Sequence, residues 1–172
     1  MERKMRRFKQ QLTEEASVEI LRDATAGVMA LCGNDMEPYG VPLSHVYTDG
    51  KLYFHSALKG HKLDLLAQNK KASYTVIAQD EVHPETYTTY FKSVIAFGTV
   101  RIIEDHAEKL RALQLLGHRC NPDDEDGLAK EIAGGFSRCI MLEMDIERLT
   151  GKQSIEPVSY THLRAHETLM NL

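Results

Sequence analysis

The residues with the clearest chemical potential lie between Phe54 and Lys62, where a strand end passes through a glycine into a helix start. The Ser56 hydroxyl, the ammonium groups of Lys59 and Lys62, and the free backbone N–H groups of the helix start would converge on one small volume. Each exposed group contributes only about 1 kcal/mol, so binding of a phosphate monoester depends on their convergence. The same residues also fit an ordinary solvated helix start, and both interpretations stay open.

No other segment carries a recognisable catalytic constellation. His55 ends the same strand, where a histidine serves either as a hydrogen-bonded packing residue or as a functional group, and His45 is a weaker candidate. Cys32 and Cys139 lie in apolar strand patterns that predict buried, protonated thiols rather than nucleophiles. The sequence contains no Ser-His-Asp or Cys-His arrangement, no G-x-G-x-x-G and no P-loop, so we assign no catalytic residue.

The composition is that of an ordinary globular protein. The chain has 172 residues, 42% hydrophobic and 27% charged, which predicts one compact domain. Three cysteines without a C-x-x-C pair argue against a disulfide framework or a zinc site and fit a reducing cytoplasm. A net charge of −4 argues against nucleic acid as a partner. Without an apolar run of about 18 residues or a signal core, we expect a cytoplasmic protein without a membrane segment.

Hydrophobic periodicity predicts strands and helices in an α+β arrangement. The expected strands cover residues 28–32, 39–47, 51–56, 72–78, 87–103 and 139–146. The expected helices run from Thr13 to near Gly27 and over residues 61–69, 105–116 and 128–133, and residues 79–85 are expected to form a loop.

Three residue types refine this outline. Asp49-Gly50 predicts a type I′ hairpin turn, which needs positive φ at both positions and makes the flanking strands antiparallel. Pro42 lacks a backbone donor and predicts an edge strand or a local irregularity. Gly98 is expected to mark a bend in the longest strand.

Several stretches in order resemble one known family. They are Tyr39–Ser44 (YGVPLS), Tyr53–Ala57 (YFHSA) with Gly60–Lys62 (GHK), Phe91–Gly98 (FKSVIAFG) and Thr150–Lys152 (TGK). Together they are similar to the Nim-type (nitroimidazole-resistance) branch of the pyridoxamine 5'-phosphate oxidase-related FMN-binding split barrels, over roughly residues 5–155. The resemblance implies an antiparallel Greek-key split β-barrel of about six strands with flanking helices. It also implies a homodimer with FMN in clefts between the subunits.

The resemblance assigns cofactor-binding roles residue by residue. Val41, Pro42, Leu43 and Ser44 would line the isoalloxazine ring mainly through backbone groups, and His55 and Ser56 would approach the ribityl phosphate. His61 and Lys62 align with the phosphate-binding Arg-Lys pair of the oxidases, and Ser93 aligns with a polar flavin contact on the neighbouring strand. His61 replaces an arginine and so removes a permanent bidentate donor, which makes weaker or pH-dependent phosphate binding the expectation.

The function implied is that of an FMN-dependent oxidoreductase acting on a small, electron-poor substrate such as a nitroaromatic. In such an enzyme the cofactor performs the chemistry while the protein binds and orients it. The residues that recognise substrate in the oxidases are not visible here, so substrate and electron donor stay open. One alternative is a non-catalytic module that binds a flavin or haem, with His55 or His45 as an axial ligand, and another is a barrel that binds no ligand.

The last residues look foreign to the protein. Val158–Thr168 (VSYTHLRAHET) resembles the translation of a transposase adapter used in sequencing libraries. We therefore expect an FMN-binding split-barrel domain over residues 1–157 and a non-native tail over residues 158–172. His162 and His166 in this tail have the i, i+4 spacing of metal ligands, but no Glu partner or third ligand accompanies them, and we assign no metal site.

Overall fold

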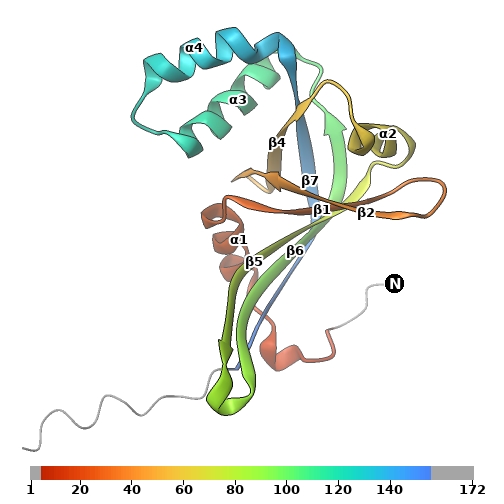
Figure 1. Cartoon of the computed structure of the whole chain (residues 1–172), viewed down its shortest axis with the longest axis vertical. Coiled ribbons are helices and arrows are strands. Elements are labelled where there is room, and N and C mark those ends of the chain that lie inside the picture. The colour runs from red at the N-terminus through yellow and green to blue at the C-terminus, as the bar shows by residue number, and fades with distance from the viewer. Residues whose placement is uncertain (1–4, 156–172) are drawn as a thin grey trace, which may run out of the picture.

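The computed structural model describes residues 5–155, which form a seven-stranded antiparallel sheet and four α-helices (Figure 1). The strands are β1 (Ala26–Cys32), β2 (Pro38–Ser44), β3 (Val46–Thr48), β4 (Lys51–Ala57), β5 (Lys71–His83), β6 (Thr88–Ile102) and β7 (Cys139–Gln153). The helices are α1 (Glu14–Asp23), α2 (His61–Gln68), α3 (His106–Cys120) and α4 (Glu125–Gly135). The predicted tail, with His162 and His166, lies outside the described residues.

The strands are arranged in the order β2-β1-β5-β6-β7-β4-β3, and every neighbouring pair is antiparallel. The sheet curls so that Cα atoms of β2 come within 8 Å of β4, although the two strands are far apart in the strand order. The predicted α+β class with an antiparallel barrel-like sheet is confirmed. The single strand expected over residues 39–47 is wrong, because the chain breaks at His45 and forms β2 and β3 instead.

The hairpin and edge predictions and the helix starts expected at residues 13 and 105 are confirmed. Asp49 and Gly50 have φ angles of 49° and 78°, as the turn between β3 and β4 requires. Thr13 and Asp105 cap α1 and α3 by accepting bonds from backbone N–H groups three residues later. Pro42 lies in β2, which is an edge strand. The helices differ in length from expectation, since α1 ends at Asp23 and α3 continues to Cys120.

The core lies on the inner face of the curled sheet. Successive strand residues point to opposite faces, and the inward positions of each strand are apolar. Leu21 of α1 packs there with Met29, Phe54, Tyr74 and Leu142, all of them fully buried. A smaller cluster on the outer face lies under α3 and contains Ile103, Ala112, Leu116 and Met141.

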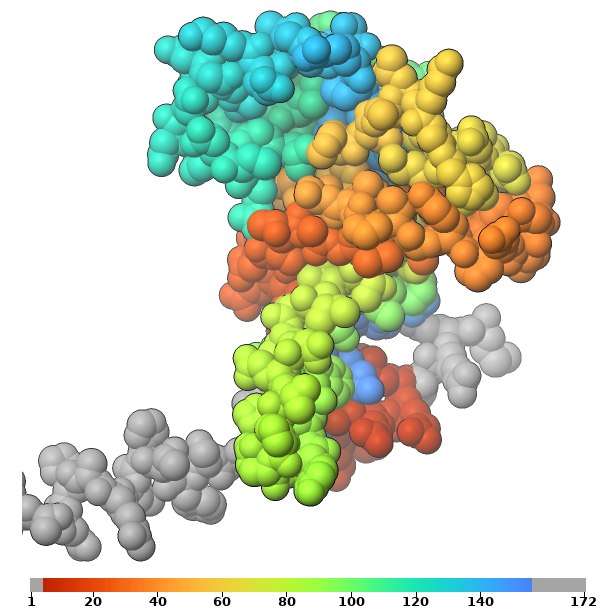
Figure 2. Space-filling model, in the orientation of Figure 1, coloured from red at the N-terminus to blue at the C-terminus, as the bar shows by residue number. Residues whose placement is uncertain are grey.

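The far parts of β5 and β6 form a two-stranded arm that projects from the body of the molecule (Figures 1 and 2). The loop expected over residues 79–85 is wrong, because β5 continues to His83 and pairs with β6 up to that residue. The β5 part of this ribbon is largely exposed on both faces, so its sequence lacks the apolar alternation of a half-buried strand. The polar run Gln79–Glu81 therefore looked like a loop.

Gly98 lies in the barrel part of β6, between the core residues Ala96 and Val100. A β-bulge lies at this position, with the extra residue Glu147 on β7, since Phe97 pairs with Arg148 and Gly98 with Ile146. A Cβ atom at residue 98 would collide with the backbone carbonyl oxygen of Asp145. Only glycine lets the two strands approach this closely. No helix within residues 5–155 has the length and apolar character needed to cross a membrane.

Candidate functional site

The start of α2 follows directly after β4 and presents unpaired backbone donors. Gly60 is the N-cap residue, and its φ of 147° is one that L side chains rarely adopt. No side chain caps the helix, while the N–H groups of Leu63 and Asp64 both donate to the Gly60 carbonyl oxygen, at 2.8 and 3.3 Å. The N–H groups of His61 and Lys62 lie ahead of the first helical bonds and remain available to a ligand.

The predicted phosphate ligands approach this helix start to different extents. Lys62 is half-buried and His61 is exposed. Ser56 is buried with 3% exposure, and its hydroxyl donates to the Ala57 carbonyl oxygen at 3.1 Å. His55 is exposed and, as the preceding strand residue, points to the opposite face of the sheet. The structure therefore does not bring the side chains of His55 and Ser56 together.

The β2 segment divides its four predicted flavin-lining residues between two faces. Val41 and Leu43 pack against the core, whereas Pro42 and Ser44 are exposed on the outer side. Tyr39, earlier in β2, meets the imidazole of His61 edge to face with ring centroids 4.8 Å apart. This contact places the β2 edge beside the start of α2, as a shared cofactor cleft requires.

A buried hydrogen-bond chain supports β2 from inside the barrel. The Tyr74 hydroxyl donates to the Leu43 carbonyl oxygen at 2.7 Å and lies 2.9 Å from Nδ1 of His45. Nε2 of His45 lies 2.8 Å from the Leu21 carbonyl oxygen, so this nitrogen is the donor. Burial lowers the pKa of His45 and favours the neutral ring, in which Nδ1 must accept. Nδ1 and the Leu43 carbonyl then compete for the single hydroxyl hydrogen of Tyr74.

These contacts argue against His45 as the axial haem ligand considered from the sequence. His45 is 1% exposed, and both of its ring nitrogens are engaged with protein groups. It cannot serve as an axial haem ligand without losing one of these bonds. His55 remains as the exposed alternative. Within residues 5–155 no three His, Cys, Asp or Glu side chains cluster in a way that could hold a metal ion.

Ser93 lies far along the sheet from Ser56 of the same chain. It pairs with Ile77 and Lys152, whereas Ser56 pairs with Ile140, so β7 separates the strands that carry the two serines. Ile140 and Lys152 are separated by about 40 Å along β7, at the usual rise per strand residue. Ser93 lies on β6, which neighbours β5 and β7 and not β4.

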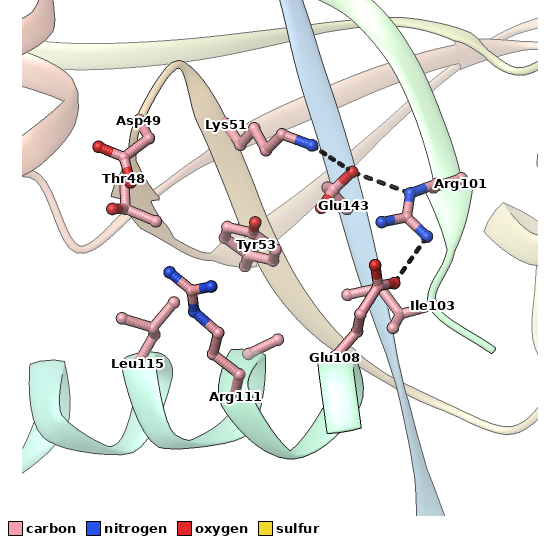
Figure 3. Close-up of a pocket in the computed structure, with 11 residues that line it drawn as sticks. Thr48, Asp49, Lys51, Tyr53, Arg101, Ile103, Glu108, Arg111, Leu115 and Glu143 are labelled. Atoms are coloured by element: carbon pink, nitrogen blue, oxygen red, sulfur yellow. Dashed lines mark hydrogen bonds and ion pairs between the residues drawn. The ribbon is translucent and has the colours of Figure 1, made fainter. Parts of the chain in front are cut away.

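A second site, which sequence reasoning missed, is a cavity of about 290 Å³ between α3 and the outer face of the sheet (Figure 3). The buried carboxylate of Glu143 accepts bonds there from Lys51 Nζ and Arg101 Nε, each at 2.8 Å. Arg101 also pairs with Glu108 at 3.0 Å. Burial alone would raise the pKa of Glu143, but hydrogen bonds from Arg101, Lys51 and Tyr53 outweigh it and hold the pKa below its usual value.

The only sequence signal for this second site is Glu143, a charged residue within the alternating apolar pattern of β7. Its partners Arg101 and Lys51 are 42 and 92 residues away along the chain, and no local pattern connects them.

Solved structures with the same fold include proteins named for flavin and haem binding. One is a Bacteroides thetaiotaomicron protein provisionally named a 5-nitroimidazole antibiotic resistance protein, at 22% identity and TM-score 0.70, covering 83% of this chain and 86% of that one. Another is a FAD and haem binding protein from Mycobacterium smegmatis, at 23% identity and TM-score 0.70, covering 86% and 74%. A third is a FAD-binding protein from Mesorhizobium loti, at 24% identity and TM-score 0.58, covering 85% and 98%. At these identities the likeness shows the fold.

The sequence itself places the chain in a family. None of the curated proteins matches it. The model of the family described as pyridoxamine 5'-phosphate oxidase, however, matches residues 13–153. This range extends from the cap of α1 to the last residue of β7 and so includes every predicted cofactor-binding residue. The chain accordingly belongs to the pyridoxamine 5'-phosphate oxidase family, whose split-barrel fold it adopts.

Proposed function

We propose that this protein binds FMN and acts as a flavin-dependent oxidoreductase. The observation that carries the proposal is the start of α2, where free backbone N–H groups and Lys62 follow β4 directly and lie beside the edge of β2. Helix starts of this kind suit phosphate groups, because the N–H groups and the helix dipole both favour negative charge. The match to the family model over residues 13–153 supports the same reading.

The residues present fit the two ends of a flavin. Lys62 and the N–H groups of His61 and Lys62 would hold the terminal phosphate. The outward side of β2, with Pro42 and Ser44 exposed, would face the isoalloxazine ring. His61 stands where the oxidases carry an arginine, so its contribution to phosphate binding would depend on its protonation.

The position of Ser93 points to a site shared between two copies of the chain. Ser93 cannot reach a flavin held at Lys62 of its own chain, because about 40 Å of strand separates the two regions. The outer face near Ser93 also carries the exposed apolar residues Val28 and Ile77, which a second copy would cover. We therefore infer a homodimer in which one chain supplies Lys62 and the other supplies Ser93 to each flavin.

When bound, the flavin supplies the electron-transfer chemistry. The chain's own residues would bind the phosphate, orient the ring against β2 and exclude water from it. The Tyr74–Leu43 bond would keep the β2 carbonyl groups in place. The name of the Bacteroides neighbour supports a small nitroaromatic compound as the electron acceptor.

A flavin-uptake titration tests the proposal. Wild-type protein is expected to bind FMN and quench its fluorescence, and Lys62→Ala is expected to weaken binding about tenfold, through loss of a charge-assisted bond. Lys70→Ala removes the same charge just beyond the opposite end of α2 and serves as the control. Failure of the wild type to bind FMN or FAD, or equal affinity of the two variants, would overturn the assignment.

A mixed-dimer experiment tests whether the site is shared. Chains carrying Lys62→Ala and chains carrying Ser93→Lys, with different affinity tags, are co-expressed and the heterodimer is purified. If each flavin takes Lys62 from one chain and Ser93 from the other, the heterodimer keeps one intact site and binds half a complement of FMN. If both residues act within one chain, the heterodimer has no intact site.

A non-catalytic flavin or haem module is the second candidate, supported by the Mycobacterium smegmatis neighbour named for both FAD and haem binding. The two candidates differ in absorbance. A flavin spectrum that a reductant bleaches and a nitro compound restores supports the oxidoreductase. A Soret band that His55→Ala abolishes supports haem binding at the one exposed histidine considered for that role.

A further inference from the structure

One wall of the cavity under α3 consists of charged side chains that form ion pairs with one another. Lys51, Glu143, Arg101 and Glu108 form a continuous chain of ion pairs at 2.8–3.0 Å. Two positive and two negative charges cancel within this chain, so these side chains need no ligand. They hold β4, β6 and β7 against the first turn of α3 and so give the cavity a rigid back wall.

The helix α3 contributes two charged side chains to the cavity lining, Glu108 and Arg111, and Arg111 takes no part in these ion pairs. Its guanidinium points from α3 into the cavity, toward Tyr53 and the β3–β4 turn (Figure 3). Among residues 5–155 no carboxylate lies within 4.0 Å of it. A guanidinium presents a planar set of donors that matches a carboxylate in a two-bond geometry.

The rest of the lining sets the size and polarity of an occupant. Ile103, Ala112 and Leu115 supply apolar surface beside Arg111. A volume of about 290 Å³ is at the small end of ligand pockets. The carboxylates of Glu143 and Asp49 also line the cavity, and they would repel a dianion more strongly than a monoanion.

From these observations we propose that the α3 cavity is a second binding site, for a small organic monocarboxylate with a short apolar chain. The carboxylate pairs with Arg111, and the apolar chain lies on Ile103 and Leu115. None of the lining residues belongs to the predicted flavin-binding set, so the site is separate from the start of α2. It is also complete within one chain, and the proposal does not depend on flavin binding.

Calorimetric titration of the full chain with sodium butyrate tests the site, with inorganic phosphate and butylamine as comparison probes. Butyrate is expected to bind with a dissociation constant of about 1 mM or tighter, and more tightly than either comparison probe. Arg111→Gln is expected to weaken butyrate binding at least tenfold. Arg138→Gln, at an exposed arginine outside the cavity, is expected to leave it unchanged.

Three results would overturn the proposal. The first is no heat of binding with butyrate at 20-fold above about 1 mM. The second is equal butyrate affinity in the Arg111 and Arg138 variants, or phosphate binding as tight as butyrate binding. The third is loss of FMN uptake in Arg111→Gln, because the cavity would then belong to the flavin site. Retained FMN uptake with lost butyrate binding establishes two separate sites.

Discussion

Most of the charged groups that line the cavity under α3 are paired with one another, whereas those at the start of α2 are not paired among the described residues. Under α3, four charged side chains are joined by three ion pairs within a single chain. At the start of α2, Lys62 and the first backbone N–H groups make no such bonds among residues 5–155. Bonds that are already complete contribute to folding, whereas donors left free are available for binding. We therefore expect substitutions in the first region to change mainly stability, and those in the second to change mainly ligand affinity.

The largest expected effect comes from removing the central carboxylate of the α3 cavity. Glu143→Ala is expected to lower the free energy of unfolding by about 2 kcal/mol, because Lys51 and Arg101 lose a buried common partner. Urea denaturation of the apo protein measures the change. FMN affinity should stay within a factor of two or so.

A carboxylate on the same strand provides the matched control. Glu147 also pairs with a lysine, Lys71, but its side chain is 48% exposed against 7% for Glu143. Glu147→Ala should therefore cost only about 0.5 kcal/mol. Equal losses for the two variants would show that the network under α3 has no special role.

A substitution at the start of α2 is expected to have a smaller effect on the free energy of unfolding. Lys62→Ala removes a charge that has no ion-pair partner among residues 5–155, so the free energy of unfolding should change by no more than about 0.5 kcal/mol. The same variant is expected to weaken FMN binding about tenfold. A large loss of stability would mean that Lys62 is a structural residue and would remove the contrast between the regions.

The smallest expected effect is a pH dependence that originates beneath β2. Burial lowers the pKa of His45 below its ordinary value of 6.5, so the unfolded chain binds a proton that the folded chain resists. Its contribution to stability is complete above about pH 6.5 and is lost as the pH falls toward the lower folded-state pKa. His45→Gln should flatten this part of the stability profile measured by urea denaturation, while His55→Gln, at an exposed position, should not. An unchanged slope in His45→Gln would assign the effect to another group.

Local sequence signals predicted the parts of the fold that depend on local chemistry. Asp49-Gly50 identified its hairpin because few other residue pairs adopt positive φ twice in succession, and Thr13 identified a helix start because its hydroxyl can accept a backbone bond. The arm was missed because two exposed faces produce no apolar alternation. The break at His45 was missed because the ring turns into the core to reach Tyr74, a contact between residues 29 positions apart.

The candidate flavin site also has one part that local sequence predicts and one part that depends on the strand order. The helix start after Gly60 could be predicted from a glycine followed by basic residues, and the structure shows it beside β2. The separation of Ser93 from Lys62 was not readable, because it depends on β7 lying between β4 and β6. The roles of the individual flavin-binding residues remain predictions.

The close approach of β6 and β7 at Gly98 restricts sequence change in the barrel, whereas the length of the β5–β6 arm is free to change. One register irregularity lies near the root of the arm, between Ile77 and Gln79 on β5, opposite Ser93 and Lys92 of β6. Distal to it the ribbon is held mainly by the ladder between β5 and β6, so paired insertions or deletions near its tip would alter its reach without shifting the pairing in the barrel. A lineage could in this way change how far one copy extends over another while the barrel interior stays the same. Gly98 would stay fixed throughout, because any side chain there would separate β6 from Asp145.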